Sequence, residues 1–256
     1  MQTFAEIPSD SANLAASLHR PADARRAPVV ICCHGLTGTR IGSSYRLVTI
    51  ARQLAEVGIA CLRFDFRGCG ESDGAFQDVT TDTLLSDLYA VLDWLFAHPD
   101  LDASRIGLIA SSFGAYTAAR AVERMPGLKG CVFFAPVADP HELIQRDMSD
   151  AAWALLRKQG WIDHHGHRLG IGFFESLSRD DVPAQFAQSA RPLRVYHGAD
   201  DQQVPITHGE RYVNASRESG AIVELVSLPT GDHGMKGVPH TAQITTGSVE
   251  WMRQWL

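Results

Sequence analysis

The feature that most constrains the fold is a continuous apolar run at residues 29–33, Val-Val-Ile-Cys-Cys, which ends at His34-Gly35. A strand with one solvated face alternates apolar and polar residues, whereas a strand covered on both faces can be apolar throughout. A short apolar run that ends in a glycine turn is therefore typical of a central strand in a mostly parallel sheet. We expect helices on both faces of that sheet.

The rest of the chain alternates strand and helix patterns, as βαβ units do. Strands are predicted at residues 59–64, 105–110, 130–134, 193–197 and 222–228, and helices near 47–57, 84–95, from 113 onward and over 241–256. Segments 3–7 and 14–18 have no helix between them, so we expect an antiparallel hairpin at the sheet edge. The sequence thus predicts a single α/β domain over residues 1–256.

Composition excludes several classes of partner. The net charge is −6 and arises from 29 acidic and 23 basic residues without long runs of either, so nothing attracts a nucleic acid or an anionic membrane surface. The first residues lack a basic start followed by a long apolar run, and about 18 consecutive apolar residues occur nowhere. We therefore expect a cytoplasmic protein whose partner is a small molecule, and a homodimer is compatible with the sequence.

The five cysteines are predicted to be reduced. Their number is odd, and four of them lie in apolar runs that resemble buried strands. Neither C-x-x-C nor a cysteine–histidine spacing suited to zinc occurs, and His164-His165-Gly166-His167 lacks partnering acids, so we interpret it as a polar turn. No metal and no cofactor are expected.

A candidate nucleophile follows the predicted strand that ends at Ala110. Ser111-Ser112-Phe113-Gly114 leads directly into an alanine-rich helix, which is the strand–turn–helix context of a nucleophile elbow with Ser112 at its apex. The sharp turn requires small residues two positions before and two after the nucleophile, and Ala110 and Gly114 meet that requirement. The alternative is an ordinary helix in which Ser111 or Ser112 serves as the N-cap.

Groups that could bind an oxyanion are predicted at two places. The His34-Gly35 turn can aim the backbone N–H of Leu36 at a developing negative charge, together with the N–H of Phe113 after the nucleophile. The alternative is a plain glycine turn in which His34 only packs.

A base and an acid should follow the nucleophile in the order Ser, Asp or Glu, His. His233 lies in a tight Gly-Asp-His-Gly loop after the last predicted strand, whereas His240 stands near the start of the final helix. Asp200 and Asp201 both occupy the loop after the strand at 193–197, and Asp139 is a third candidate acid.

These motifs together resemble the α/β-hydrolase superfamily, and within it the serine esterases related to cinnamoyl and feruloyl esterases. The segments that carry the resemblance are residues 34–35, 63–74, 110–114, 197–205 and 231–233, so it spans nearly the whole chain. In that family the acid is the aspartate three residues before Val-Pro, which corresponds to Asp201. The resemblance implies a triad of Ser112, Asp201 and His233.

The sequence departs from the family pattern at two positions. Ala110 stands where the elbow usually has glycine, and Cys69 stands where the Arg-Gly-x-Gly-x-Ser turn usually has histidine. We interpret that turn as structural, and we expect the Cys69 thiol to be partly exposed and open to oxidation.

The interval between the strands at 130–134 and 193–197 is too long for one ordinary crossover. We predict a small cap at residues 139–183, above the sheet edge where open α/β sheets bind ligands. Trp161 and Phe174 are the predicted substrate-binding aromatics, and the alternative is that they only pack the cap. The resemblance implies a carboxylic ester hydrolase that uses an acyl-enzyme intermediate, with aryl-acyl esters of hydroxycinnamate type as candidate substrates. The alternatives are a serine aminopeptidase-like hydrolase, an acyl-thioester hydrolase, and a binding protein without catalysis.

Overall fold

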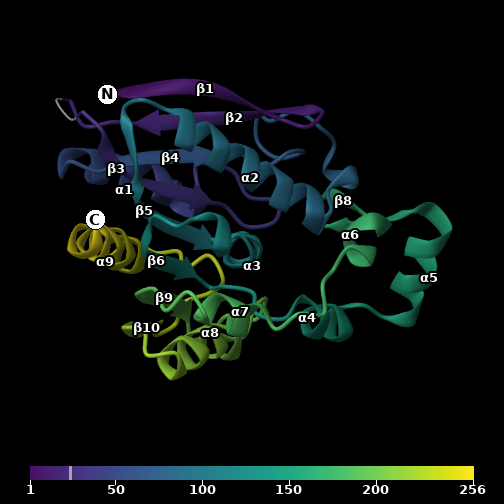
Figure 1. Cartoon of the computed structure of the whole chain (residues 1–256). Coiled ribbons are helices and arrows are strands. Elements are labelled where there is room, and N and C mark those ends of the chain that lie inside the picture. The colour runs from purple at the N-terminus through teal and green to yellow at the C-terminus, as the bar shows by residue number, and fades with distance from the viewer. Residues whose placement is uncertain (23–24) are drawn as a thin grey trace.

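A computed structural model describes residues 1–22 and 25–256 of the chain. In this part of the chain, the central sheet has eight strands in the order β1-β2-β4-β3-β5-β6-β9-β10 (Figure 1). The pairs β1–β2 and β2–β4 are antiparallel, and the other neighbours are parallel. The strands are β1 (Gln2–Ser9), β2 (Ala12–His19), β3 (Ala27–Cys33), β4 (Ala60–Phe64), β5 (Leu101–Ser111), β6 (Leu128–Phe134), β9 (Leu193–Gly198) and β10 (Val223–Leu228). The predicted edge hairpin and parallel sheet are confirmed.

The apolar run in β3 is buried on both faces of the sheet. Val29 and Ile31 belong to one hydrophobic cluster, and Val30 and Cys32 belong to another on the opposite face. All seven residues of β3 are buried. Because successive side chains point to opposite faces, an unbroken apolar run is what this central position requires.

Helices cover both faces of the sheet. Residues of α1 (Arg46–Glu56) and α9 (Val238–Trp255) form one cluster with the strands, and these two helices contact each other. The other face is covered by α2 (Thr81–Ala97), α3 (Phe113–Arg120), α7 (Val182–Ala187) and α8 (Ile206–Glu218). Short 3-10 turns lie at η1 (Ser43–Tyr45), η2 (Phe76–Asp78) and η3 (Val122–Arg124). The result is a three-layer α/β/α arrangement, which confirms the predicted fold class.

The interval between β6 and β9 contains several small elements. They are α4 (Pro140–Asp147), α5 (Asp150–Gln159), the hairpin of β7 (Trp161–His164) and β8 (His167–Gly170), and α6 (Ile171–Glu175), followed by α7. Figure 1 shows α5 at the far end of the molecule from α9. The Asp139 carboxylate caps α4 by accepting hydrogen bonds from the amides of His141 and Glu142. These elements occupy the region predicted as the cap.

The histidine-rich segment 164–167 forms a polar turn, as predicted: His165 (φ 54°) and Gly166 (φ 84°) connect β7 and β8. Among the described residues, the structure contains no group of three or more His, Cys, Asp or Glu side chains arranged to hold a metal ion. All five cysteines are buried, and burial raises the pKa of Cys69 to about 12. The expectation that Cys69 is partly exposed is wrong, because its turn packs against the body of the protein. No helix in residues 1–22 and 25–256 has the length and apolar composition needed to cross a bilayer.

Candidate active site

Ser112 lies at a strained turn between β5 and α3. Its backbone has φ 51° and ψ −123°, a region that non-glycine residues rarely adopt. The amide of Ser112 donates to the Phe134 carbonyl at 2.8 Å, and its carbonyl accepts from the Val137 amide at 3.2 Å. These two bonds to β6 and the residues after it fix the turn and leave the hydroxyl at the C-terminal edge of the sheet.

Small residues surround this turn, as an elbow requires. A Cβ atom on Gly35 would lie 3.0 Å from the Ser112 Cβ. Ala110 is fully buried and lies opposite Cys33 and Phe133 in the neighbouring strands. The alanine that departs from the family pattern is therefore accommodated within the sheet.

His233 connects Ser112 to Asp201. The Nε2 atom of His233 lies 3.0 Å from the Ser112 hydroxyl, and its Nδ1 atom lies 2.7 Å from Asp201 Oδ2. The Asp201 carboxylate can only accept at neutral pH, so Nδ1 carries the proton and Nε2 presents a lone pair to the serine. The structure brings the three residues predicted for the triad into one hydrogen-bonded chain.

The environment of Asp201 keeps its carboxylate ionised. Burial raises the pKa of Asp201, but hydrogen bonds from His197, His233 and the Val204 amide outweigh burial and hold it well below its usual range. The second carboxylate oxygen, Oδ1, accepts from the amides of Gln203 and Val204, both at 2.9 Å. Both oxygens are therefore fixed, and Oδ2 is directed at His233.

The other candidates for these roles lie elsewhere. Asp200 is exposed, and the Asp139 carboxylate is used to cap α4. His240 is in the first turn of α9, and Ser111 is the last residue of β5. Among the described residues, none of the four is hydrogen-bonded to His233.

The amides of Leu36 and Phe113 are free to bind a ligand. Neither amide donates to another group within residues 1–22 and 25–256. His34 braces the loop that carries Leu36: its Nδ1–H donates to the Gly35 carbonyl at 2.7 Å, and its Nε2 accepts from the Phe66 amide at 3.0 Å. Burial lowers the pKa of His34, consistent with this neutral tautomer. The sequence analysis placed His34 in the turn that carries the Leu36 amide or in a packing role. The hydrogen bond between His34 and the Phe66 amide joins residues that are far apart in the sequence, so it could not be predicted from the sequence.

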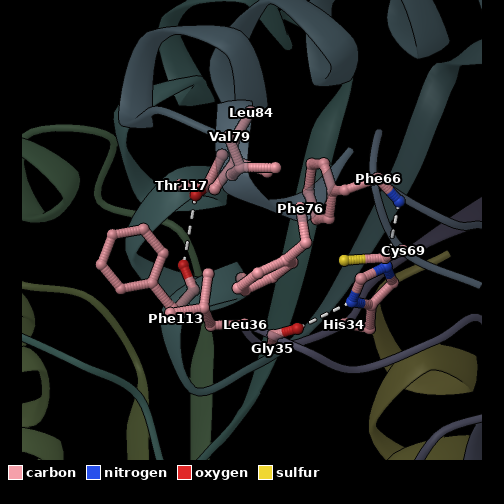
Figure 2. A pocket seen from close by; sticks show the side chains of 11 residues that line it. His34, Gly35, Leu36, Phe66, Cys69, Phe76, Val79, Leu84, Phe113 and Thr117 are labelled. Carbon is pink, nitrogen blue, oxygen red and sulfur yellow. Dashed lines mark hydrogen bonds between the residues drawn. The ribbon is translucent and has the colours of Figure 1, made fainter. Parts of the chain in front are cut away.

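A small cavity adjoins these two amides (Figure 2). Leu36 and Phe113 both line this cavity, which has room for about one water molecule. Thr117 on its wall has its hydroxyl bonded to the Phe113 carbonyl at 3.2 Å. The full lining is His34, Gly35, Leu36, Phe66, Cys69, Phe76, Val79, Leu84, Phe113, Gly114 and Thr117. The cavity is therefore mostly apolar.

The predicted substrate-binding aromatics have other partners in the structure. The Arg168 guanidinium lies 4.7 Å from the Trp161 ring centroid, and the ring of Phe174 packs edge-on against Trp153 at 5.5 Å. Neither Trp161 nor Phe174 lines the cavity beside Phe113. Phe173 comes nearer to the elbow, with its ring 5.1 Å from that of Phe113. Sequence reasoning grouped Phe173 with the cap aromatics and gave it no separate role.

The sheet order and the Ser112 turn define the class of the protein as an α/β-hydrolase. The chain belongs to the family described as "Serine aminopeptidase, S33", whose model matches residues 24–171. The esterase Est1E from Butyrivibrio proteoclasticus, solved with ferulic acid bound, has a similar structure: the TM-score is 0.84 at 22% identity, and the match covers 98% of each chain. The resemblance to feruloyl esterases is confirmed at the level of the fold.

The curated relatives are longer than this chain. An uncharacterized protein of Mycobacterium tuberculosis is 30% identical over 206 residues, which is 80% of this chain and 63% of that protein. Palmitoyl-protein thioesterase ABHD10 of Homo sapiens is 23% identical over 221 residues, covering 82% of this chain and 68% of that protein. The chain spans between 35% and 63% of the length of the first curated relatives that it matches.

Proposed function

We propose that this protein is a serine hydrolase that cleaves carboxylic esters, with Ser112 as nucleophile, His233 as general base and Asp201 as the acid. The observation that carries the proposal is the hydrogen-bonded chain from the Ser112 hydroxyl through both nitrogens of His233 to Asp201. A serine hydroxyl hydrogen-bonded to an imidazole that is itself oriented by a carboxylate is the arrangement that activates a serine.

The reaction proceeds in two halves. Ser112 Oγ attacks the ester carbonyl carbon while His233 Nε2 takes the hydroxyl proton, and the amides of Leu36 and Phe113 bind the resulting oxyanion. The tetrahedral intermediate collapses, the C–O bond to the alcohol breaks, and His233 returns the proton to the departing oxygen. Water then attacks the acyl-enzyme with proton transfer to His233, and collapse releases the carboxylic acid and restores Ser112.

Aryl-acyl esters of the hydroxycinnamate type are the proposed substrates. The structural similarity to an esterase with ferulic acid bound supports this choice, as does the aromatic content of the segment between β6 and β9. An aryl-acyl group would lie under this segment, because the cavity beside Phe113 holds only about one water molecule.

Thioester hydrolysis is the second candidate. A match to a palmitoyl-protein thioesterase over 82% of the chain favours it, and the same three residues would serve a thiolate leaving group. Aminopeptidase chemistry, which the family's description names, requires the same residues as well. The preference among leaving groups is set by the pocket around the triad, so it must be measured with a panel of substrates.

A fluorophosphonate probe and a substrate panel test the proposal. We expect the probe to label wild-type protein at Ser112, and Ser112→Ala to abolish labelling and lower kcat by on the order of a millionfold. Ser111→Ala is the matched control and should change kcat little. Labelling at Ser111, or no labelling of folded wild-type protein, would contradict the proposal and favour a binding protein. Comparing kcat/KM across a substrate panel then ranks the leaving groups. The panel is methyl ferulate, p-nitrophenyl acetate, an acyl thioester and an aminoacyl amide.

A further inference from the structure

Arg46 is buried beside the loop that carries His233. This first residue of α1 is only 3% exposed. One of its terminal nitrogens, Nη2, donates to the carbonyls of Gly234 at 2.7 Å and Met235 at 3.1 Å. These are the two residues that follow His233, so the guanidinium holds the backbone at the point where the loop leaves the imidazole.

The same guanidinium lies against the residue that anchors the Ser112 turn. Its central carbon is 5.4 Å from the centroid of the Phe134 ring. Phe134 is the last residue of β6, and its carbonyl accepts the hydrogen bond from the Ser112 amide. One side chain therefore touches both the loop of the base and the residue that fixes the turn of the nucleophile.

Burying this arginine is costly without such contacts. Burial lowers the pKa of Arg46 to about 10, so the side chain stays charged at neutral pH. The direct partners of the guanidinium are the two carbonyls and the ring face of Phe134, and the charge of Asp232 acts on it at longer range and partly offsets the cost of burial. Met235 has φ 45°, a strained backbone that persists only when its surroundings hold it.

We propose that Arg46 is a positioning residue that holds His233 in line with Ser112. The proposal rests on the proposed function, in which His233 is the base. A loop bound through two carbonyls cannot shift away from Ser112 without breaking both hydrogen bonds, so the distance between Nε2 and the hydroxyl is kept short. Substrate does not contact Arg46 in this role, and substrate binding should depend little on it.

Arg46→Ala and Arg46→Lys test the proposal with p-nitrophenyl acetate. We expect Arg46→Ala to lower kcat by about 10- to 100-fold while KM changes little, because misplacing a catalytic group by about 1 Å costs on this scale. Guanidinium chloride at low, non-denaturing concentration should restore part of the lost kcat by occupying the vacated site. Arg46→Lys keeps the charge, so we expect it to lower kcat less than Arg46→Ala does. It should still lower kcat, because an ammonium group cannot bind both carbonyls in the same geometry as the guanidinium.

Arg194→Ala is the matched control. Arg194 also donates to a backbone carbonyl, that of Gly247 at 2.7 Å, and also lies against an aromatic ring, that of Trp251 at 4.5 Å. It stands near the start of β9, at the opposite end of that strand from Asp201. We expect its loss to reduce stability while kcat stays within about twofold of wild type and does not respond to guanidinium.

Failure of this inference and failure of the proposed function give different results. If wild-type protein shows neither labelling nor hydrolysis, the proposed function fails. The Nδ1 proton of His233, followed by NMR, then tests Arg46 without any substrate. Its signal should weaken through faster exchange with water in the Arg46 variants and stay unchanged in Arg194→Ala. Wild-type kcat in a folded Arg46→Ala overturns the inference, and if that variant does not fold, wild-type kcat in Arg46→Lys overturns it.

Discussion

The carbonyl oxygen of His34 occupies the space into which a side chain on Gly114 would project. An ideal Cβ on Gly114 would lie only 2.0 Å from that oxygen. His34 directly follows β3, and Gly114 is the second residue of α3, so the loop of Leu36 and the turn of Ser112 are in backbone contact. This contact brings together the two free amides that are proposed to bind the oxyanion.

We therefore predict that Gly114→Ala damages both stability and catalysis. The added methyl must push the His34 loop away from α3, which should cost at least about 1–3 kcal/mol of unfolding free energy and lower kcat by separating the amides. Urea denaturation and kcat on p-nitrophenyl acetate measure the two effects. Gly172→Ala in α6 is the control, since its Cβ would only contact Thr80 at an ordinary 3.5 Å. Equal behaviour of the two variants would refute the prediction.

Substitutions of Asp201 and its neighbour Asp200 test which aspartate is the acid of the triad. Asp201→Asn should lower kcat by roughly a thousandfold or more, because an amide no longer enforces the tautomer in which Nε2 accepts the serine proton. Asp200→Asn should leave kcat nearly unchanged, since Asp200 is exposed and does not bond His233. The measurement is kcat from steady-state kinetics on both variants. A severe loss of kcat in Asp200→Asn, or in Asp139→Asn alone, would show that Asp201 is not the acid of the triad.

Aromatic residues between β6 and β9 should affect specificity. Trp161→Ala and Phe174→Ala are expected to reduce kcat/KM for methyl ferulate by an amount equivalent to about 1–3 kcal/mol and to spare p-nitrophenyl acetate. Phe173→Ala should slow both substrates, because its ring packs against Phe113 beside the nucleophile. If Trp161→Ala and Phe174→Ala slow the two esters equally, these rings are not part of an acyl pocket, and if they only lower the melting temperature, they serve packing.

His19 predicts how stability depends on pH. Burial, with the charge of Arg63, lowers the pKa of His19 to about 4, and its Nε2 atom lies 2.9 Å from Arg63 Nη2. Between the unfolded pKa of about 6.5 and the folded value, the unfolded chain binds more protons, so stability is lost as pH falls through this window. His19→Gln keeps an acceptor for Arg63 but does not titrate. Its unfolding free energy should fall less than that of wild type between pH 7 and pH 4, and parallel curves would contradict the assignment.

Sequence reasoning succeeded where local pattern and position coincide. The apolar run of β3 predicted a central strand, because burial on both faces leaves no room for polar residues. The serine turn could be predicted as well, since few sequences place small residues around a serine between strand and helix. The predicted ends of elements are less accurate: β5 begins at Leu101 rather than 105, because Leu101 pairs with Ala27 of β3 ahead of a register shift, and the polar residues that follow it hide the start of the strand in the sequence.

The rest depends on contacts between distant residues. Asp200 and Asp201 are adjacent and chemically identical, so only the family resemblance favoured Asp201 in the sequence, and the direction of each side chain in the folded loop shows that Asp201 is the one that contacts His233. Arg46 and Gly234 are 188 positions apart, and an arginine at the start of a helix carries no sign of a buried partner. The small elements between β6 and β9 were also missed, because short helices and hairpins there depend on capping and turn geometry.

Because the cysteines are buried, the active sites of this protein can be titrated with a reagent that reacts with serine. All five thiols are enclosed, and burial raises the pKa of Cys33 and Cys131 well above the ordinary value, so thiolate is scarce at neutral pH. An electrophile aimed at Ser112 therefore meets no accessible thiol in the native protein. One equivalent of a chromogenic phosphonate should then release one equivalent of dye per competent molecule. The burst amplitude gives the active fraction of a preparation directly, and every kcat compared above can be normalised to it.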